Sequence, residues 1–539
     1  MLTEPVVFHR TSVILRLAVS MVVIGVSCCP EFVLANSVQA STEARDHADR
    51  GMQLAQSGDL KAAEGELLLA IKLRPGDPTY LALMGGVLGM QQRLAESSAY
   101  FEKSLKIDPN DASTRRNLAS NQFQMGQLQL AKENLDRVLK AKPSDNTAIL
   151  LRGMVAEELK DFPNAIRWLE SVPDQVRERA KSIVALARSY YHTNQSQKGR
   201  ELLGSLQQHP DGSDGVFLGA QVATELADYE TAASLLDSIR ATYSDSAKLD
   251  YQLALVQYRS GRYEECRNNL ERLVNSGRSS AEAFNLLGWC YHKLNNLKEA
   301  IAAMDLAIDR EPNRDTNYRD LGLILMDHKR YVVALEAAKK AVEVAPNSYE
   351  ACMLKGQVER KMNRLKEAVK TFQRAVELNP KASEAYLSLA SAQSADGLTQ
   401  EAATSFERGT ERFPNEPLLF QEYGKMLLNM RKGSGDATES RAIALLKRAI
   451  VLNPSLTEPH YQLGNLALLH ERPTEALHYL QKAAELDPKS SKIHFALRRT
   501  YSRLGRNEEA GKELELYNVL KAAESKSESS AAVTAKDAE

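Results

Sequence analysis

The sequence predicts an all-α protein built from one repeated pair of helices, and three observations carry this prediction. The 539 residues are 43% hydrophobic but only 6% aromatic, and the chain is rich in residues that favour helices, such as Ala, Leu, Glu and Lys. Apolar residues recur at spacings of three and four in paired blocks, as in amphipathic helices. Prolines recur at intervals of 34 residues, namely Pro75, Pro109 and Pro143, then Pro312, Pro346, Pro380 and Pro414, then Pro454 and Pro488.

The charge balance bears on the class of partner. The chain has 69 Lys and Arg against 70 Asp and Glu, a formal net charge of -1. Proteins that bind nucleic acid by general electrostatic attraction carry a basic surplus. We therefore expect no nucleic-acid partner, and RNA-binding helical repeats with a basic inner face are disfavoured.

Residues 1–35 have the pattern of a secretory signal peptide. Basic residues up to Arg16 precede the uncharged, mostly apolar run 17–29, and Val33-Leu34-Ala35 supplies the residues that signal peptidase reads. We expect cleavage after Ala35, with Ala40 as a second candidate.

Two alternatives to cleavage stay open. The apolar run is short for an uncleaved anchor, which needs about 20 residues. Cys28 follows Gly25-Val26-Ser27, which resembles a lipoprotein motif but has Gly25 where a Leu-like residue is expected. The sequence predicts an exported protein, periplasmic or secreted, with no membrane span in the mature chain; membrane anchoring by the signal or by lipid is the alternative.

Helix–helix packing and helix ends explain the repeated residues. The small residue at the eighth position of the unit, such as Gly288, lets two helix backbones approach. The proline after the second helix cannot continue it, and residues such as Asp111 are good N-caps for the next helix. One helix pair cannot bury its own apolar face, whereas stacked pairs form a continuous core.

The unit resembles the tetratricopeptide repeat (TPR), whose pattern is Leu-Gly and Tyr on the first helix, Ala and Phe on the second, and then Pro. The fullest copies contain Leu287-Gly288, Tyr291, Ala300, Ala307 and Pro312; Leu321-Gly322, Ala334, Ala341 and Pro346; Gly356, Ala368, Phe372, Ala375 and Pro380; and Leu463-Gly464, Ala476, Ala483 and Pro488. The resemblance implies an α-solenoid of about 14 helix-turn-helix units that form a right-handed superhelix.

The repeat pattern changes along the chain and divides it into segments. The expected segments are the signal peptide 1–35, a linker 36–43, an N-terminal lobe 44–172, irregular units 173–245, a C-terminal lobe 246–521 with a loop insertion near 431–440, and a disordered tail 522–539.

Three of the five cysteines remain after signal cleavage, namely Cys266, Cys290 and Cys352. An odd number at irregular spacing is not a disulfide framework, so buried free thiols are the favoured interpretation. A Cys266–Cys290 bridge is the alternative.

Motifs for catalysis are missing from the sequence. It has no phosphate-binding glycine loop and no nucleophile elbow. His470-Glu471 begins a zinc motif, but Thr474 stands where its second histidine would be. The nearest histidines, His460, His470, His478 and His494, are expected on different helices and faces. We expect no enzyme, no catalytic residue, no cofactor and no metal.

The resemblance implies that partners bind the inner face, lined by positions 2, 5, 9 and 12 of the first helices. The candidate partner-binding residues are Asn285, Trp289, His292, Arg319, Leu323, Met326, Met353, Gln357 and Arg360. Trp289 is either a binding hot spot or packed against the neighbouring helix. The carboxylate clamp of chaperone-binding TPR proteins is missing, since Tyr461 stands where a Lys would precede Asn465.

These observations predict a non-catalytic protein–protein interaction scaffold of the bacterial cell envelope, which binds partner peptides or helices in its inner groove. The alternative is a non-catalytic targeting or substrate-presenting subunit of an envelope enzyme or of a polysaccharide or protein export complex.

Overall fold

The computed structural model describes the backbone of residues 30–430 and 436–536, and the side chains of 41–430 and 437–525. Across these ranges the regular structure is helical, with 29 α-helices and one 3-10 helix. The prediction of an all-α fold is confirmed.

Two compact units make up the chain, Met1–Ser244 and Asp245–Glu539, called the first and second unit below. The first unit contains α1 (Pro30–Gln56), α2 (Leu60–Leu73), α3 (Pro78–Met90), α4 (Leu94–Ile107), α5 (Ala112–Gln124), α6 (Leu128–Ala141), α7 (Asn146–Glu158), α8 (Phe162–Glu170), α9 (Pro173–Arg177), α10 (Ala180–His192), α11 (Ser196–Ser205), the 3-10 helix η1 (Leu206–Gln208), α12 (Gly212–Glu225) and α13 (Tyr229–Ser238).

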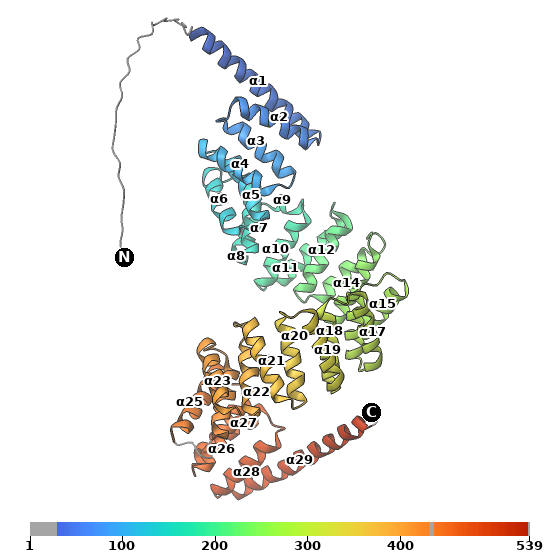
Figure 1. Cartoon of the computed structure of the whole chain (residues 1–539), viewed down its shortest axis with the longest axis vertical. Helices are drawn as coiled ribbons and strands as arrows, with labels where there is room; N and C mark the ends of the chain where they lie inside the picture. The colour runs from blue at the N-terminus through green and yellow to red at the C-terminus, as the bar shows by residue number, and fades with distance from the viewer. Residues whose placement is uncertain (1–29, 431–435, 537–539) are drawn as a thin grey trace, which may run out of the picture. The chain divides into compact units, whose positions relative to one another are not determined.

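The second unit continues the same alternation of first and second helices (Figure 1). It contains α14 (Ser246–Arg259), α15 (Tyr263–Asn275), α16 (Ala281–Lys293), α17 (Leu297–Arg310), α18 (Asp315–Asp327), α19 (Tyr331–Val344), α20 (Tyr349–Lys361), α21 (Leu365–Leu378), α22 (Ser383–Ala395), α23 (Thr399–Arg412), α24 (Pro417–Asn429), α25 (Asp436–Leu452), α26 (Thr457–Leu469), α27 (Pro473–Leu486), α28 (Ser491–Arg503) and α29 (Asn507–Lys536).

Consecutive helices pack as pairs, from α1 with α2 to α28 with α29. With α9 and η1 as additions, the described residues hold 14 such pairs, the number that the sequence predicts. Each pair is one repeat below.

Capping residues explain where the first helices begin. The Asp77 carboxylate accepts a hydrogen bond from the backbone N–H of Thr79 at 3.0 Å, and Asp145 accepts one from Ala148 at 3.0 Å. These bonds satisfy N–H groups that the helix itself leaves unpaired. The residues after the repeated prolines therefore set the start of the next repeat.

Glycine at the eighth position of the repeat permits close helix packing, as the sequence predicts. A Cβ at Gly288 would lie 2.8 Å from Met304 Cε, and one at Gly85 would lie 2.6 Å from Phe101 Cδ1. Both distances are far below the van der Waals contact of two carbon atoms. A larger residue at this position would push the first helix away from the second.

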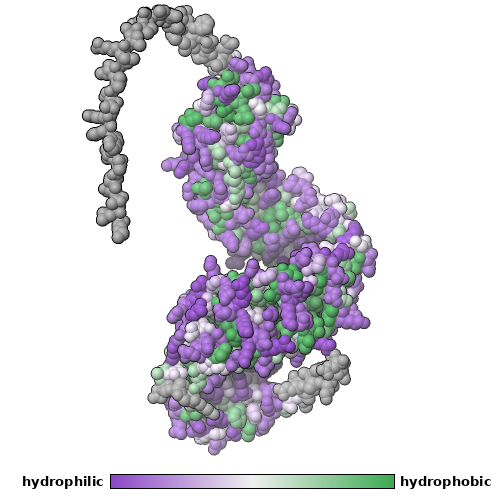
Figure 2. Space-filling model, in the orientation of Figure 1, coloured by the Kyte–Doolittle hydropathy of each residue, from purple (hydrophilic) through white to green (hydrophobic). Residues whose placement is uncertain are grey.

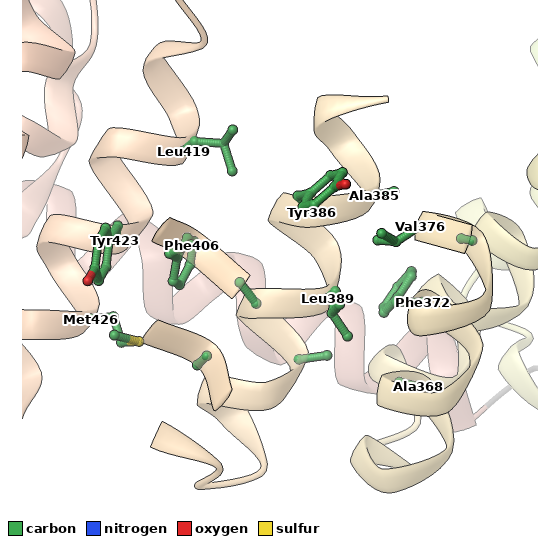
Figure 3. Packing of buried hydrophobic residues seen from close by; sticks show 14 of the residues in the cluster. Ala368, Phe372, Val376, Ala385, Tyr386, Leu389, Phe406, Leu419, Tyr423 and Met426 are labelled. Atoms are coloured by element: carbon green, nitrogen blue, oxygen red, sulfur yellow. The ribbon is translucent and has the colours of Figure 1, made fainter. Parts of the chain in front are cut away.

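Core residues of neighbouring repeats join into continuous clusters. In the cluster of Figure 3, Phe372 on α21 packs toward Tyr386 and Leu389 on α22, and Phe406 on α23 stacks on Tyr423 of α24. The Phe406 and Tyr423 ring centroids are 5.3 Å apart with an interplanar angle of 9°. Alternate large and small residues thus fill the space between consecutive helices.

In and just before the stretch 173–245, the second helices are shorter than in the regular repeat. Both α8, with 9 residues, and α11, with 10, are shorter than the 14 residues of α2, α4 and α6. Proline at position 173 begins the extra helix α9, because proline is tolerated in a first turn but not inside a helix. The short helix α9 follows α8, and the 3-10 helix η1 follows α11, where a regular second helix would continue.

Three expected boundaries differ from the structure. α1 begins at Pro30, so the expected linker 36–43 and the cleavage residue Ala35 lie in a helix, while residues 1–29 of the expected signal lie outside the described residues. α29 continues to Lys536 where a disordered tail was expected after 521. Its Ala, Glu and Lys residues are strong helix formers, so a polar composition does not prevent a helix.

The third boundary concerns the insertion. It lies between α24 and α25, as the repeat register predicts, but α25 already begins at Asp436, inside the range near 431–440 expected to be loop. Residues 431–435 lie outside the described residues.

The favoured expectation for the cysteines is wrong for two of the three. Cys266 on α15 forms a disulfide with Cys290 on α16, with 6.7 Å between their Cα atoms. Cys352 is free and buried. The pairing follows from packing, because consecutive helices of adjacent repeats bring the two thiols together, and sequence spacing does not reveal this.

Over the ranges that the structure describes, none of the helices combines the length and the apolar character needed to cross a membrane.

Candidate functional site

The candidate partner-binding residues all lie on first helices of the second unit. α16 carries Asn285, Trp289 and His292, α18 carries Arg319, Leu323 and Met326, and α20 carries Met353, Gln357 and Arg360. The helices belong to three consecutive repeats, so the residues form a row across adjacent repeats.

Asp320 on α18 holds this row together. Its carboxylate accepts a hydrogen bond from Asn285 Nδ2 at 2.8 Å and another from the indole of Trp289. Burial raises the pKa of Asp320 above its ordinary value, although both hydrogen bonds act in the opposite direction. Sequence reasoning missed Asp320, because position 6 of the helix was not among the inward positions considered.

Trp289 packs within its own chain. The side chain is part-buried and packs against the core cluster that includes Ile324 and Leu325, as do Leu323 and Met326. Its indole is already hydrogen-bonded, so the side chain acts first as a link between α16 and α18. Packing against the neighbouring helix, one of the two alternatives, is therefore what the structure shows; whether a partner also touches Trp289 stays a prediction.

Arg319 lies between two carboxylates. Its Nε is 3.2 Å from Asp315 Oδ2, and Nη1 is 4.0 Å from Glu350 Oε2. Thr316 Oγ1 accepts a weak bond from Nη2 at 3.4 Å. With two acidic neighbours, Arg319 is a poor site for a free anion.

The three candidates on α20 differ in access. Met353 is only 5% exposed and belongs to the core cluster with Phe372 and Leu389, so its expected place on a binding surface is wrong. The fifth position of α20 is therefore part of the hydrophobic core rather than of the open surface. Gln357 Nε2 donates to Glu384 Oε1 at 3.4 Å, and Arg360 is exposed.

His292 meets a histidine of the next repeat. Its Nδ1 is 3.2 Å from Nε2 of His328, and its Nε2 is 3.5 Å from Oδ2 of Asp327. The rings of His292 and Trp289 meet edge to face, with centroids 5.4 Å apart. Sequence reasoning missed Asp327, the last residue of α18, and His328, which caps that helix.

Two tyrosines on α14 extend the row toward the start of the second unit. Tyr251 and Tyr258 stand 34 residues before Asn285 and His292, so the repeat period alone could have found them. Burial, with Tyr263 and Asp320 nearby, raises the pKa of Tyr258 to about 12. Both tyrosines pack partly against the core.

The inner face of the first unit contains a groove, unlike the filled inner face around Trp289 in the second unit. A groove of about 430 Å³ is lined by α1, α3 and α5. Small residues at positions 5 and 9 of α3, Ala82 and Gly86, form its floor, and a Cβ at Gly86 would meet nothing within 4 Å. Met52 and Met90 line the same groove and are 40% and 56% exposed.

Carboxylates stand at one end of this groove. Asp108 and Asp111 line it together with Asn117. Burial raises the pKa of Asp111, but hydrogen bonds from Ser113 and Thr114 outweigh it and lower the pKa overall. Asp111 is therefore a negative charge beside an apolar floor at neutral pH.

A second hollow, of about 690 Å³, lies where α8 and α11 are short. Its wall includes the buried residues Leu169 and Ile183. The polar groups at its rim are engaged with one another, since Tyr190 donates to Glu170 and His209 Nε2 lies 2.9 Å from the Arg177 carbonyl oxygen. On the face shown in Figure 2, hydrophobic residues form separate patches among hydrophilic ones in both units.

Most of the carboxylates at the inner face of α16, α18 and α20 are engaged within the protein. The carboxylates of Asp320 and Glu350 face a donor and a cation of neighbouring repeats, and Asp315 pairs with Arg319 on its own helix, as in a structural surface network. Among the described residues, no three of the His, Cys, Asp and Glu side chains are grouped to hold a metal ion.

Sequence models described as tetratricopeptide repeat match five parts of the chain. One matches residues 116–180, 251–315 and 353–417, a second matches 467–522, and a third matches 79–111. Together these ranges cover more than half of the 539 residues.

Individual proteins are similar at low identity. The "Cellulose synthase operon protein C" of Pseudomonas fluorescens is 24% identical over 319 residues, which are 56% of this chain and 24% of that protein. The "Protein CTR9 homolog" of Arabidopsis thaliana is 21% identical over 304 residues, 54% of this chain and 28% of that protein. The chain thus spans about a quarter of the length of each.

Among solved structures, yeast Tom70 aligns with 90% of this chain and 96% of its own, at 16% identity and a TM-score of 0.37.

Proposed function

Because the chain belongs to the tetratricopeptide repeat family, we propose that it is a non-catalytic scaffold whose inner groove in the first unit binds a partner protein. The observation that carries the proposal is the open groove over Ala82 and Gly86 in the first unit. The inner face around Trp289 in the second unit, by contrast, is filled by the protein's own side chains. An apolar hollow with a few polar groups at its edge is a typical binding site.

The lining of the groove defines the partner chemistry. Met52, Leu83 and Met90 offer flexible apolar surface that adapts to a helix face. Asp108 and Asp111 favour a basic residue at one end of the ligand. An amphipathic helix with an apolar stripe and one flanking Lys or Arg meets both requirements.

We place the scaffold in the bacterial cell envelope. The export pattern in residues 1–35 supports this location, and so does the Cys266–Cys290 disulfide, because disulfides persist in oxidising compartments. Partners would then be envelope proteins.

The alternative is a non-catalytic subunit of an envelope enzyme or export complex. The relative named for a cellulose synthase operon favours this version. The two versions differ in whether an enzyme is recovered together with the protein.

A single glycine tests the groove. Gly86→Leu fills the floor without a clash, since nothing lies within 4 Å of its Cβ. Gly65→Leu is the matched control, because Gly65 is exposed on α2 and its Cβ also meets nothing within 4 Å. Tagged wild type and both variants would be crosslinked in source cells, captured and compared by quantitative mass spectrometry.

We expect the principal envelope partner to be lost from Gly86→Leu and kept by Gly65→Leu. A Trp289→Ala, Arg319→Ala double variant tests the second unit in the same way. If the partner is lost from this double variant alone, the binding site lies on the inner face of α16 and α18. Equal capture by all forms would overturn both assignments.

A further inference from the structure

Two histidines of adjacent repeats face each other on the second unit. His292 lies in the last turn of α16, and His328 is the residue that caps the end of α18. Nδ1 of His292 and Nε2 of His328 are 3.2 Å apart, with an interplanar angle of 77° between the rings. Two nitrogens on one tetrahedral zinc ion, at about 2.0–2.1 Å each, are about 3.3 Å apart. The pair therefore has nearly the spacing of two metal ligands.

The protonation of His292 suits a metal ligand. Asp327 Oδ2 lies 3.5 Å from its Nε2 and favours a proton on that nitrogen. The lone pair is then on Nδ1, which points to His328. A carboxylate on the far nitrogen of a ligating histidine is the usual arrangement at zinc sites.

The surroundings also favour a cation held by neutral imidazoles. Both histidines stand at helix C-termini, where unpaired carbonyl groups give a partial negative charge. Burial, followed by the nearby His328 and Lys293, lowers the pKa of His292, so its ring is neutral at pH 7. The positive charge of Lys293 disfavours a bound cation, and the negative charge of Asp327 compensates for it.

We propose that His292 Nδ1 and His328 Nε2 bind one divalent transition-metal ion of the zinc class, which replaces the proton that the two nitrogens share. Imidazole nitrogen suits Zn²⁺, Cu²⁺ and Ni²⁺. The described residues supply no third ligand, so water completes the coordination and the ion exchanges readily. The ion links the repeats α16–α17 and α18–α19.

Trp289 provides the readout, because its ring centroid is 5.4 Å from that of His292. The chain has two tryptophans, and Trp168→Phe leaves Trp289 as the single emitter. Full-length Trp168→Phe protein would be titrated with Cu²⁺ at pH 7.5, followed by fluorescence quenching, and then with Zn²⁺ as a competitor. We expect saturable quenching by one Cu²⁺ per chain that Zn²⁺ reverses.

Three further variants in the same background locate the ion. His328→Gln should abolish the saturable quenching, and Asp327→Asn should weaken the Cu²⁺ affinity by about tenfold. His470→Gln is the matched control, since His470 caps α26 at the repeat position that His328 occupies in α18. It should bind as the parent does.

Circular dichroism would show that each variant is folded. Quenching that is unchanged in His328→Gln, or lost equally in His470→Gln, would show adventitious binding to surface histidines and overturn the proposal. Loss of binding in His328→Gln with an unchanged spectrum supports it.

Discussion

The amide Nδ2 of Asn285 on α16 lies 2.8 Å from the carboxylate Oδ2 of Asp320 on α18. The same Asn285 group is 3.2 Å from Asn317 Oδ1, and the indole of Trp289 reaches Asp320 as well. Four side chains, two on α16 and two on α18, thus join consecutive first helices on the face where a partner is expected. A ligand that used these donors would have to break bonds inside the protein first.

The Asp320 carboxyl predicts a pH dependence of stability. Its pKa is raised in the folded state above the ordinary 3.8, so the folded protein binds more protons than the unfolded chain just above that pH. The stability that Asp320 contributes is therefore present at low pH and is lost as the pH rises through its folded pKa. Asp320→Asn does not titrate and keeps an acceptor for Asn285.

Urea denaturation of Asp320→Asn and wild type between about pH 4 and 7 would check this. We expect the free energy of unfolding of the variant, relative to wild type, to increase across that range. A difference that is constant with pH would contradict the assignment.

Two adjacent glycines on α3 predict opposite effects of the same substitution. Gly85→Ala puts a Cβ 2.6 Å from Phe101 and should destabilise the protein by about 1–3 kcal/mol. Gly86→Ala meets no atom within 4 Å and should stabilise it by up to about 1 kcal/mol through helix propensity. Thermal denaturation of both variants measures the contrast, and equal melting temperatures would show that the eighth position is not sterically restricted.

The disulfide predicts a defined peptide map. Digestion without reductant should yield one crosslinked species containing Cys266 and Cys290, and Cys352 should react with iodoacetamide only after unfolding, because its thiol is buried. The double variant Cys266→Ala, Cys290→Ala should lose about 3 kcal/mol of unfolding free energy, as expected for a loop of this length. Alkylation of all three thiols in unreduced, unfolded protein would refute the bridge.

Export predicts a shortened N-terminus. Protein isolated from the periplasm or medium of the source organism should begin at Asn36, after cleavage behind Ala35. Intact-mass measurement distinguishes this form from the full chain and from one cut after Ala40. A full-length mass in the membrane fraction would favour the uncleaved anchor, and a lipid-modified Cys28 the lipoprotein.

The regular part of the fold could be predicted from the sequence because each repeat uses the same local rules. The 34-residue spacing of prolines, the glycine at position 8 and the capping aspartates act within or between neighbouring helices, so the pattern is visible in the chain itself. The short lengths of α8 and α11 could not be read from the sequence, although Pro173 indicates that the repeat is irregular there. A polar composition alone does not reveal that α29 continues to Lys536, because Ala, Glu and Lys are strong helix formers, and Glu and Lys are also common in disordered segments.

The inner face could be predicted only in part. The period located the helices that carry Trp289 and Arg319, but not which neighbour each side chain contacts. Asp320, His328 and Asp327 act on residues of the preceding repeat, and such a relation depends on the angle between repeats. The burial of Met353 in the cluster with Phe372 and Leu389 is likewise set by tertiary packing, which the repeat period does not show.

The bridge between α15 and α16 joins two different repeats, because α15 closes the pair α14–α15 and α16 opens the pair α16–α17. In a linear array each repeat is stabilised only by its neighbours, so unfolding spreads from an end one repeat at a time. A covalent tie across a junction limits how far the two joined helices can separate when one repeat unfolds. Pulled from either terminus, the second unit would resist separation at this junction until the sulfur–sulfur bond is reduced, and the compartment's redox state would set its mechanical strength.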